Sequence, residues 1–170
     1  MAKIEKITPS LWFDTQAEDA ARYYTSIFKD SSIDHLTYYT QAGKEIHKKK
    51  PGSVMTVEFN LMGQKFVALN GGPEFKFNEA ISFIVDCETQ DEVDFFWNKL
   101  IIGGDPKAQQ CGWLKDKFGL SWQIVPKTLN EMIKDKDQEK VERVMDVMMK
   151  MKKLDIRELE EAAEGHAVSH

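Results

Sequence analysis

Two segments of the chain show the same change in the spacing of their hydrophobic residues. In each segment apolar residues first alternate with polar ones, as on a half-buried strand, and then recur every three or four positions, as on one face of a helix. The first segment begins at Leu11 and the second at Phe83, an offset of 72 residues, and at the same offset Asp14 aligns with Asp86. We interpret this correspondence as an internal duplication of a strand and a helix.

Strand patterns follow each of the two predicted helices. After the first helix, the sequence predicts strands over 33–40, 53–61 and 66–69. After the second, it predicts shorter strands over 111–114 and 121–125. Each half is interpreted as a βαβββ module. Neither module alone buries both faces of its sheet, so we expect the two modules to pair in an α+β fold.

Beyond residue 127 the pattern becomes helical. Capping boxes are predicted at Thr128 with Glu131 and at Asp155 with Glu158. Apolar residues at helical spacing lie between them: Val141, Val144, Met145, Met148 and Met149. We interpret the methionines as packing residues rather than as a cofactor site, because methionine fills irregular apolar gaps well. The sequence therefore predicts one domain over 1–127, with modules at 1–75 and 76–127, and a C-terminal helical extension of that domain over 128–165.

Composition and charge narrow the class of protein. The chain has 170 residues, 42% of them hydrophobic, and a net charge of −5, which argues against a nucleic-acid partner. No apolar stretch approaches the about 20 residues that cross a bilayer, and the N-terminus has no apolar signal core, so no membrane partner is expected. Cys87 and Cys111 form neither a disulfide framework nor a metal-type spacing. These features are typical of a cytoplasmic protein.

Several sequence blocks resemble the PhnB-like family, which is often described as a 3-demethylubiquinone-9 3-methyltransferase domain. The resemblance extends from about residue 4 to residue 160, and these blocks carry it: Pro9–Asp14, Tyr23–Tyr24, Leu69–Pro73, Ile81–Phe83 and Cys111–Pro126. It implies two βαβββ modules that form a cupped mixed sheet, and a homodimer. It also places the chain near the wider vicinal-oxygen-chelate superfamily (glyoxalases, bleomycin-resistance proteins and dioxygenases). Enzymes of that superfamily hold a divalent metal in the cup, so the resemblance implies a metal site there. It does not imply a settled activity.

The metal that the resemblance implies has few ligands in this sequence. The four superfamily positions fall on Thr8, on Val67 or Ala68, on Ala80 and on Gln123. Only Gln123 is a plausible donor, whereas zinc, nickel or iron needs about three or more protein ligands. The four histidines, which we interpret as surface or edge residues, do not replace the missing ligands: His35, His47, His166 and His170. The sequence predicts no metal and no cofactor.

The methyltransferase description finds no support in the glycine pattern. Most methyltransferases that use S-adenosylmethionine have a glycine-rich turn between a strand and a helix. Here Gly71–Gly72 is followed by Pro73 without a helix, and Gly103–Gly104 ends a predicted helix.

The remaining candidate site is an aromatic pocket on the concave face of the sheet. Three tryptophans on predicted strands and three polar residues are the candidate ligand-binding residues: Trp12, Trp113 and Trp122, with Asn70, Ser82 and Gln123. Apolar walls with a few polar groups suit a small molecule. The alternative is that the tryptophans pack against helices or a dimer partner. Cys111 is interpreted as a buried structural residue, and no catalytic residue is assigned.

Three functions are compatible with this pattern. The favoured hypothesis is metal-free binding of a small apolar or aromatic ligand. The second is an enzyme acting on a small aromatic or quinone-like substrate, either without metal or as a metal-dependent glyoxalase or dioxygenase. The third is a structural or regulatory dimer whose pocket is vestigial.

Overall fold

The computed structural model describes residues 7–165, so His166 and His170 lie outside the described residues. The chain forms two compact units, Met1–Lys76 and Phe77–His170. None of the helices within 7–165 is long and apolar enough to cross a membrane.

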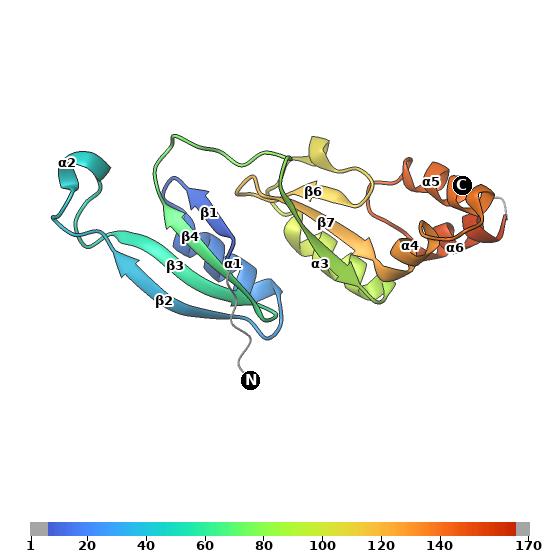
Figure 1. Cartoon of the computed structure of the whole chain (residues 1–170), viewed down its shortest axis with the longest axis horizontal. Helices are drawn as coiled ribbons and strands as arrows, with labels where there is room; N and C mark the ends of the chain where they lie inside the picture. Colours follow the sequence, from blue (N-terminus) through green and yellow to red (C-terminus); the bar gives the residue numbers. More distant parts are fainter. Residues whose placement is uncertain (1–6, 166–170) are drawn as a thin grey trace. The chain divides into compact units, whose positions relative to one another are not determined.

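The first unit is a four-stranded mixed sheet with one long helix on one face (Figure 1). Its elements are β1 (Ser10–Phe13), α1 (Ala17–Ile27), β2 (Ser32–Tyr38), α2 (Lys44–His47), β3 (Val54–Leu61) and β4 (Gln64–Asn70). The strand order is β1-β4-β3-β2, and only the β1–β4 pair is parallel. The predicted hairpin between β3 and β4 is confirmed, with Met62 and Gly63 at positive φ in its turn.

The core of the first unit lies between α1 and one face of this sheet. Ala17, Ala20 and Ala21 are fully buried, which allows the helix to approach the strands closely. Tyr24 stacks on Phe59 with ring centroids 6.3 Å apart. Because side chains alternate along a strand, the residues between these core positions point to the opposite face, which no helix of this unit covers within residues 7–76.

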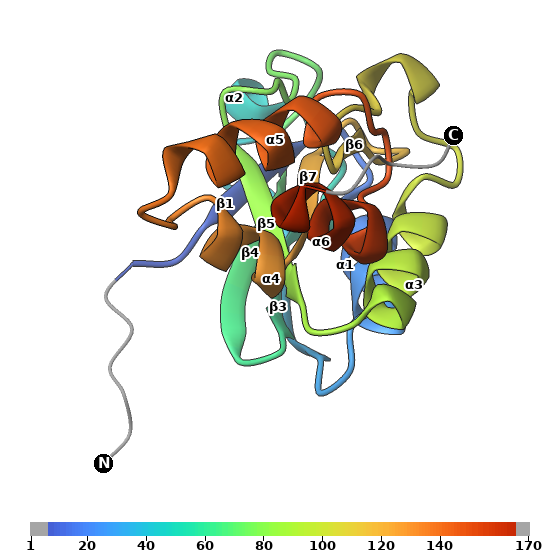
Figure 2. The same cartoon turned by 90° about the vertical axis from the view of Figure 1, so that its right-hand side faces the viewer.

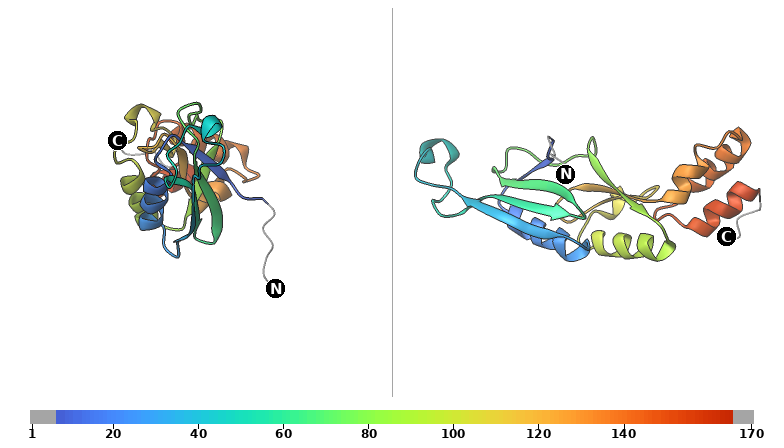
Figure 3. Two further views of the ribbon diagram at one scale, coloured as in Figure 1. Left: turned by 90° about the vertical axis from the view of Figure 1, so that its left-hand side faces the viewer. Right: turned by 60° about the horizontal axis from the view of Figure 1, so that its bottom comes forward.

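The second unit repeats the arrangement with a smaller sheet. Its elements are β5 (Ser82–Cys87), α3 (Gln90–Leu100), the 3-10 helix η1 (Pro106–Ala108), β6 (Trp113–Lys115), β7 (Ser121–Pro126), α4 (Lys127–Met132), α5 (Gln138–Met148) and α6 (Ile156–Glu164). The strand order is β5-β7-β6, with β5 parallel to β7, as β1 is to β4. The right-hand view of Figure 3 shows α3 along one face of this sheet, as α1 lies along its own.

The predicted α+β class with mixed sheets and a helical extension is confirmed, and so is the duplicated strand and helix. The second sheet has three strands where the first has four. The segment after α3 forms turns and η1, and its β-pairing with β6 is a single bridge between Gln110 and Trp113. Cys111, expected within a strand, has a positive φ of 51° and lies in the turn before β6.

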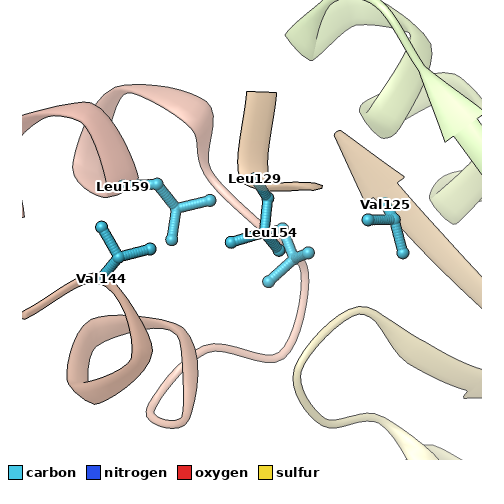
Figure 4. Close-up of a cluster of buried hydrophobic side chains, with 5 residues drawn as sticks. All are labelled: Val125, Leu129, Val144, Leu154 and Leu159. Carbon is cyan, nitrogen blue, oxygen red and sulfur yellow. The ribbon is translucent and has the colours of Figure 1, made fainter. Parts of the chain in front are cut away.

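The three C-terminal helices have a small hydrophobic core that continues from the end of β7 (Figure 4). It consists of Val125, Leu129, Val144, Leu154 and Leu159. Figure 2 shows α4, α5 and α6 gathered together, and α5 contacts α6 along its length. The predicted N-cap at Asp155 is confirmed, since its carboxylate accepts a hydrogen bond from the Glu158 amide, but among the described residues no return bond from the Asp155 amide to the Glu158 carboxylate completes the capping box.

The predicted capping box at Thr128 is wrong. Helix α4 begins at Lys127, directly after the last residue of β7, and Pro126 occupies its N-cap. Thr128 therefore lies inside the helix, and its hydroxyl oxygen is buried without a hydrogen-bond partner.

Candidate functional site

Trp12 lies on the open face of the first sheet and is held by the loop that follows β4. Its indole Nε1 donates to the Gly72 carbonyl at 2.8 Å, and its ring meets Phe75 edge to face at 4.9 Å. A Cβ atom on Gly71 would lie 2.2 Å from the Trp12 ring, so only glycine allows the ring to lie against this backbone. The Trp12 side chain thus orders the loop that follows β4.

Asn70 is buried, and its side-chain amide is used within the fold. Its Oδ1 accepts from the Ala17 amide at 2.8 Å, and its Nδ2 donates to the Val54 carbonyl at 3.1 Å. Gln16, at the N-cap of α1, provides no side-chain cap. Asn70 therefore satisfies an unpaired amide at the start of α1 from a neighbouring strand. Its backbone carbonyl also accepts from the Tyr39 hydroxyl at 2.8 Å.

Trp122 packs in the core beneath α3, on the covered face of the second sheet. It is 3% exposed, and its ring lies 5.7 Å from that of Phe83. Its Nε1 donates to Asp116 Oδ2 at 2.9 Å, while Asp116 Oδ1 accepts from the amides of Phe118 and Leu120. The buried carboxylate orders the turn between β6 and β7 and fixes the indole.

The other three predicted residues share the open face of the second sheet. Gln123 on β7 has two register partners, Trp113 on β6 and Ile84 on β5. Ser82 lies two residues before Ile84 and therefore on the same face. Gln123 Nε2 donates to the Ser82 hydroxyl at 2.9 Å, which fixes the orientation of the amide. The structure thus brings together three of the six predicted residues.

A cavity of about 690 Å³ lies over this face, and we call it the second-sheet cavity. The sheet and the preceding loops contribute Glu79, Ile84, Asp86, Ala108, Gln110, Cys111, Trp113, Gln123 and Val125. The C-terminal helices and the segments that join them contribute Leu129, Asn130, Ile133, Met148, Met149 and Leu154. Its volume is in the range of small-molecule sites, as is its combination of apolar walls and a few polar groups.

The sequence did not indicate that the second group of residues lines a cavity. Helical spacing identified the methionines, but it indicated only that they pack against something. Long-range backbone bonds bring this segment to the sheet: the amides of Cys111 and Gly112 donate to the carbonyls of Met151 and Lys152, each at 2.8 Å. Gly112 has a φ of 82°, and a Cβ there would lie 2.9 Å from both the Ile124 carbonyl oxygen and a Leu154 methyl group.

Cys111 is half-buried at the wall of the cavity, so the expectation that it is buried is wrong. Its left-handed backbone turns the residue toward α5, where its Sγ lies 3.8 Å from the Met149 Sδ. The buried cysteine is Cys87, whose side chain lies under α3. Burial raises the pKa of the Cys87 thiol to about 12, and the nearby carboxylates of Glu92 and Asp86 add to this effect.

The four superfamily metal positions do not form a ligand set. Thr8 and Ala80 lie outside strands and are exposed. Ala68 is fully buried in the core, so Val67 is the residue on the open face. Across residues 7–165, no three side chains of His, Cys, Asp or Glu are grouped closely enough to hold a metal ion. The donors at these positions do not fit a divalent metal.

A second, smaller cavity of about 270 Å³ lies in the first unit beside the start of α1. Its walls include Asp14, Tyr39, Lys49 and Asn70. Burial raises the pKa of the Tyr39 hydroxyl. His47 lies next to Tyr39, with ring centroids 4.6 Å apart, and its Nδ1 accepts from the Lys49 amide. The Tyr39 and His47 rings and the Lys49 amide therefore help to order the loop after β2.

Comparison with known proteins shows the family. The family model described as 3-demethylubiquinone-9 3-methyltransferase matches residues 5–125. A PhnB protein from Bacillus cereus is 36% identical over 72% of this chain and 99% of its own, with a TM-score of 0.61. A protein from Staphylococcus aureus is 31% identical over 72% of this chain and 96% of its own, with a TM-score of 0.32. Protein PA1353 from Pseudomonas aeruginosa shares the fold at 15% identity and a TM-score of 0.54, covering 72% of this chain and 97% of its own.

No curated protein matches the chain. The match to the family model ends at residue 125, before the C-terminal helices, and is therefore shorter than the resemblance that extended to about residue 160. The matched range nevertheless spans both sheets, and on this basis the chain belongs to the PhnB-like family, described as 3-demethylubiquinone-9 3-methyltransferase.

Proposed function

We propose that the protein binds a small, largely apolar molecule in the second-sheet cavity, without a metal. The observation that carries this proposal is the convergence of Trp113 and Gln123 with apolar side chains of the C-terminal helices around about 690 Å³. An indole, thioethers and branched aliphatic groups supply contact area, and the Gln123 amide, held by Ser82, supplies orientation.

The polar groups support binding rather than a defined reaction. Gln123 uses its Nε2 to donate to Ser82, and its Oε1 has no partner among the described residues. Gln123 therefore offers an acceptor to the cavity, and its bond to Ser82 fixes the direction of that acceptor. The amide can hold and orient a ligand, but it is neither a strong base nor a nucleophile.

A thermal-shift screen with small aromatic compounds tests this proposal, because a ligand that binds only the folded protein raises its melting temperature. We expect a subset of compounds to stabilise the protein and the variant Ile84→Arg to lose this response. Ile84 is 58% exposed and lines the cavity, so a long charged side chain at this position should project into the apolar space without disturbing the core.

Ile102→Arg is the matched control, since Ile102 is 60% exposed and does not line the cavity. An equal response in both variants would place binding elsewhere, and a screen without any stabilising compound would contradict the proposal. Binding of S-adenosylmethionine in calorimetry, abolished by Ile84→Arg, would instead support the methyltransferase description.

A further inference from the structure

The second-sheet cavity has a charge of one sign. Its ionisable carboxylates are those of Glu79 and Asp86, whereas no lysine or arginine of the described residues lines it. Glu79 forms an ion pair with Lys115, so its charge is compensated locally.

The carboxylate of Asp86 is much less compensated. It accepts one long hydrogen bond, 3.4 Å, from Asn130 Nδ2. Lys127 forms its ion pair with Glu88 and acts on Asp86 only through a weaker Coulombic attraction. Asp86 therefore presents a negative charge to the cavity, which favours a ligand with a positive group and disfavours an anion.

A second acceptor of the cavity, the Oε1 of Gln123, lies on the same sheet face. Asp86 follows Ile84 by two residues on β5, and Ile84 is the register partner of Gln123, so both side chains project from neighbouring strands in the same direction. Asp86 and the Oε1 of Gln123 can together accept hydrogen bonds from one ammonium group, which carries three donors. On the same face, Trp113 offers a ring to which a cation or a second aromatic ring is attracted.

We propose that the ligand class of this cavity is an arylalkylamine, in which an aromatic ring carries a protonated alkylamine with one positive charge. The ammonium group lies toward Asp86 and Gln123, and the aromatic body lies against Trp113 and Met149. This inference rests on the proposed function and names the ligand class of the same site.

Three naphthalene compounds of equal ring size test the charge preference by calorimetry: 2-naphthylmethylamine, 2-naphthylmethanol and 2-naphthoate. We expect the amine to bind about tenfold more tightly than the alcohol, and the carboxylate to bind most weakly. In Asp86→Asn the amine should lose its advantage over the alcohol. In Asp91→Asn, which removes an exposed carboxylate outside the cavity, the advantage should remain.

The two proposals fail in different ways. Equal affinities for the three compounds, or an amine preference that survives Asp86→Asn, would overturn the amine assignment and leave binding intact. Absence of binding by all three in calorimetry, together with no stabilising compound in the thermal-shift screen, would contradict the binding function itself. Circular dichroism checks that Asp86→Asn is folded. A second readout needs no variant: the affinity of the natural protein for the amine should fall with added salt.

Discussion

Asn70 links three elements of the first unit through one side chain and one carbonyl. It accepts from the first amide of α1, donates to the carbonyl of Val54 at the start of β3, and accepts from Tyr39. Because it is buried, each broken bond leaves a polar group without water to replace it. The residue therefore has a structural role, whereas the sequence suggested it as one of three polar residues that could contact a ligand.

Replacing Asn70 with alanine should lower the free energy of unfolding by about 1–3 kcal/mol, because the variant lacks the cap and leaves the Val54 carbonyl unpaired. Gln16→Ala is the matched control. Gln16 precedes the same helix without a side-chain cap, and its loss should change stability by less than about 0.5 kcal/mol. Urea denaturation of both variants measures the difference, and equal stabilities would contradict the assigned role.

The two cysteines should differ sharply in reactivity. The thiolate is the reactive form, and burial that raises the pKa of Cys87 to about 12 leaves it protonated at pH 8. Cys111 is half-buried at the cavity wall. A thiol reagent at pH 8 should therefore label one cysteine in the folded protein and two in denaturant. Cys111→Ser should abolish the labelling of the folded protein, and rapid labelling that persists in this variant would contradict the burial of Cys87.

The sequence predicted cavity residues only where the alternation of side chains along a strand determines the face on which a residue lies. Trp113 and Gln123 lie on the open face because side chains alternate, and that could be predicted. Trp122 lies on the covered face, since it immediately precedes Gln123. The partner that holds its indole, Asp116, could not be identified from spacing, because a turn of unknown geometry separates them.

At the scale of elements, the C-terminal helices are fixed to the second unit by specific bonds. Gln90, the first residue of α3, donates to the Leu154 carbonyl at 3.1 Å and accepts from the Ile156 amide at 2.8 Å. Asp94, one turn later, forms an ion pair with Lys153. The segment between α5 and α6 is thereby attached to α3.

Removing the Gln90 side chain should loosen this attachment. In Gln90→Ala, amide hydrogen exchange should accelerate in α6 and in residues 151–156, with little change in β5 and β7. Gln138→Ala, at the exposed start of α5, is the control and should leave exchange in α6 unaltered. Unchanged protection of α6 in Gln90→Ala would show that the hydrophobic core alone holds the helices.

Acid should weaken the same attachment. The hydrogen bond from Lys153, followed by that from Gln90, lowers the pKa of the Asp94 carboxyl below its ordinary value. A carboxyl whose pKa is lower in the folded state stabilises that state above the unfolded pKa of about 3.9, and the contribution is lost as the pH falls through the lower folded value. Partial exposure keeps this effect small. Amide hydrogen exchange in α6, corrected for intrinsic exchange rates, should accelerate in acid. This acceleration should be smaller in Asp94→Asn than in the natural protein, and an equal acceleration in both would contradict the role of Asp94.

Hydrophobic periodicity predicted most elements of both units, because each long helix and each long strand buries one continuous face. It failed where short segments obtain their conformation from distant partners. The segment before β6 is held by carbonyls of Met151 and Lys152, about forty residues away in the sequence, and no local pattern indicates such pairing. Helix α4 begins one residue before its expected cap because it continues directly from β7.

At the scale of the whole molecule, the residues that match the family and the residues that line the cavity cover different parts of the chain. The match covers both sheets and ends at residue 125, whereas part of the cavity wall comes from Leu129, Met148 and Met149. Family membership therefore accounts for the sheet that carries Trp113 and Gln123. The helices beyond the matched range supply the apolar side chains that enclose the space above it.

The most direct test of binding in the second-sheet cavity is methionine-methyl NMR during titration with 2-naphthylmethylamine. The chain has 8 methionines, and Met148 and Met149 line the cavity, whereas Met55 and Met62 belong to the first unit. Ring currents from a bound naphthalene should shift the Met148 and Met149 signals in a saturable manner and leave those of Met55 and Met62 unchanged. Saturable shifts confined to Met55 and Met62, or no shift at any methionine, would contradict the account.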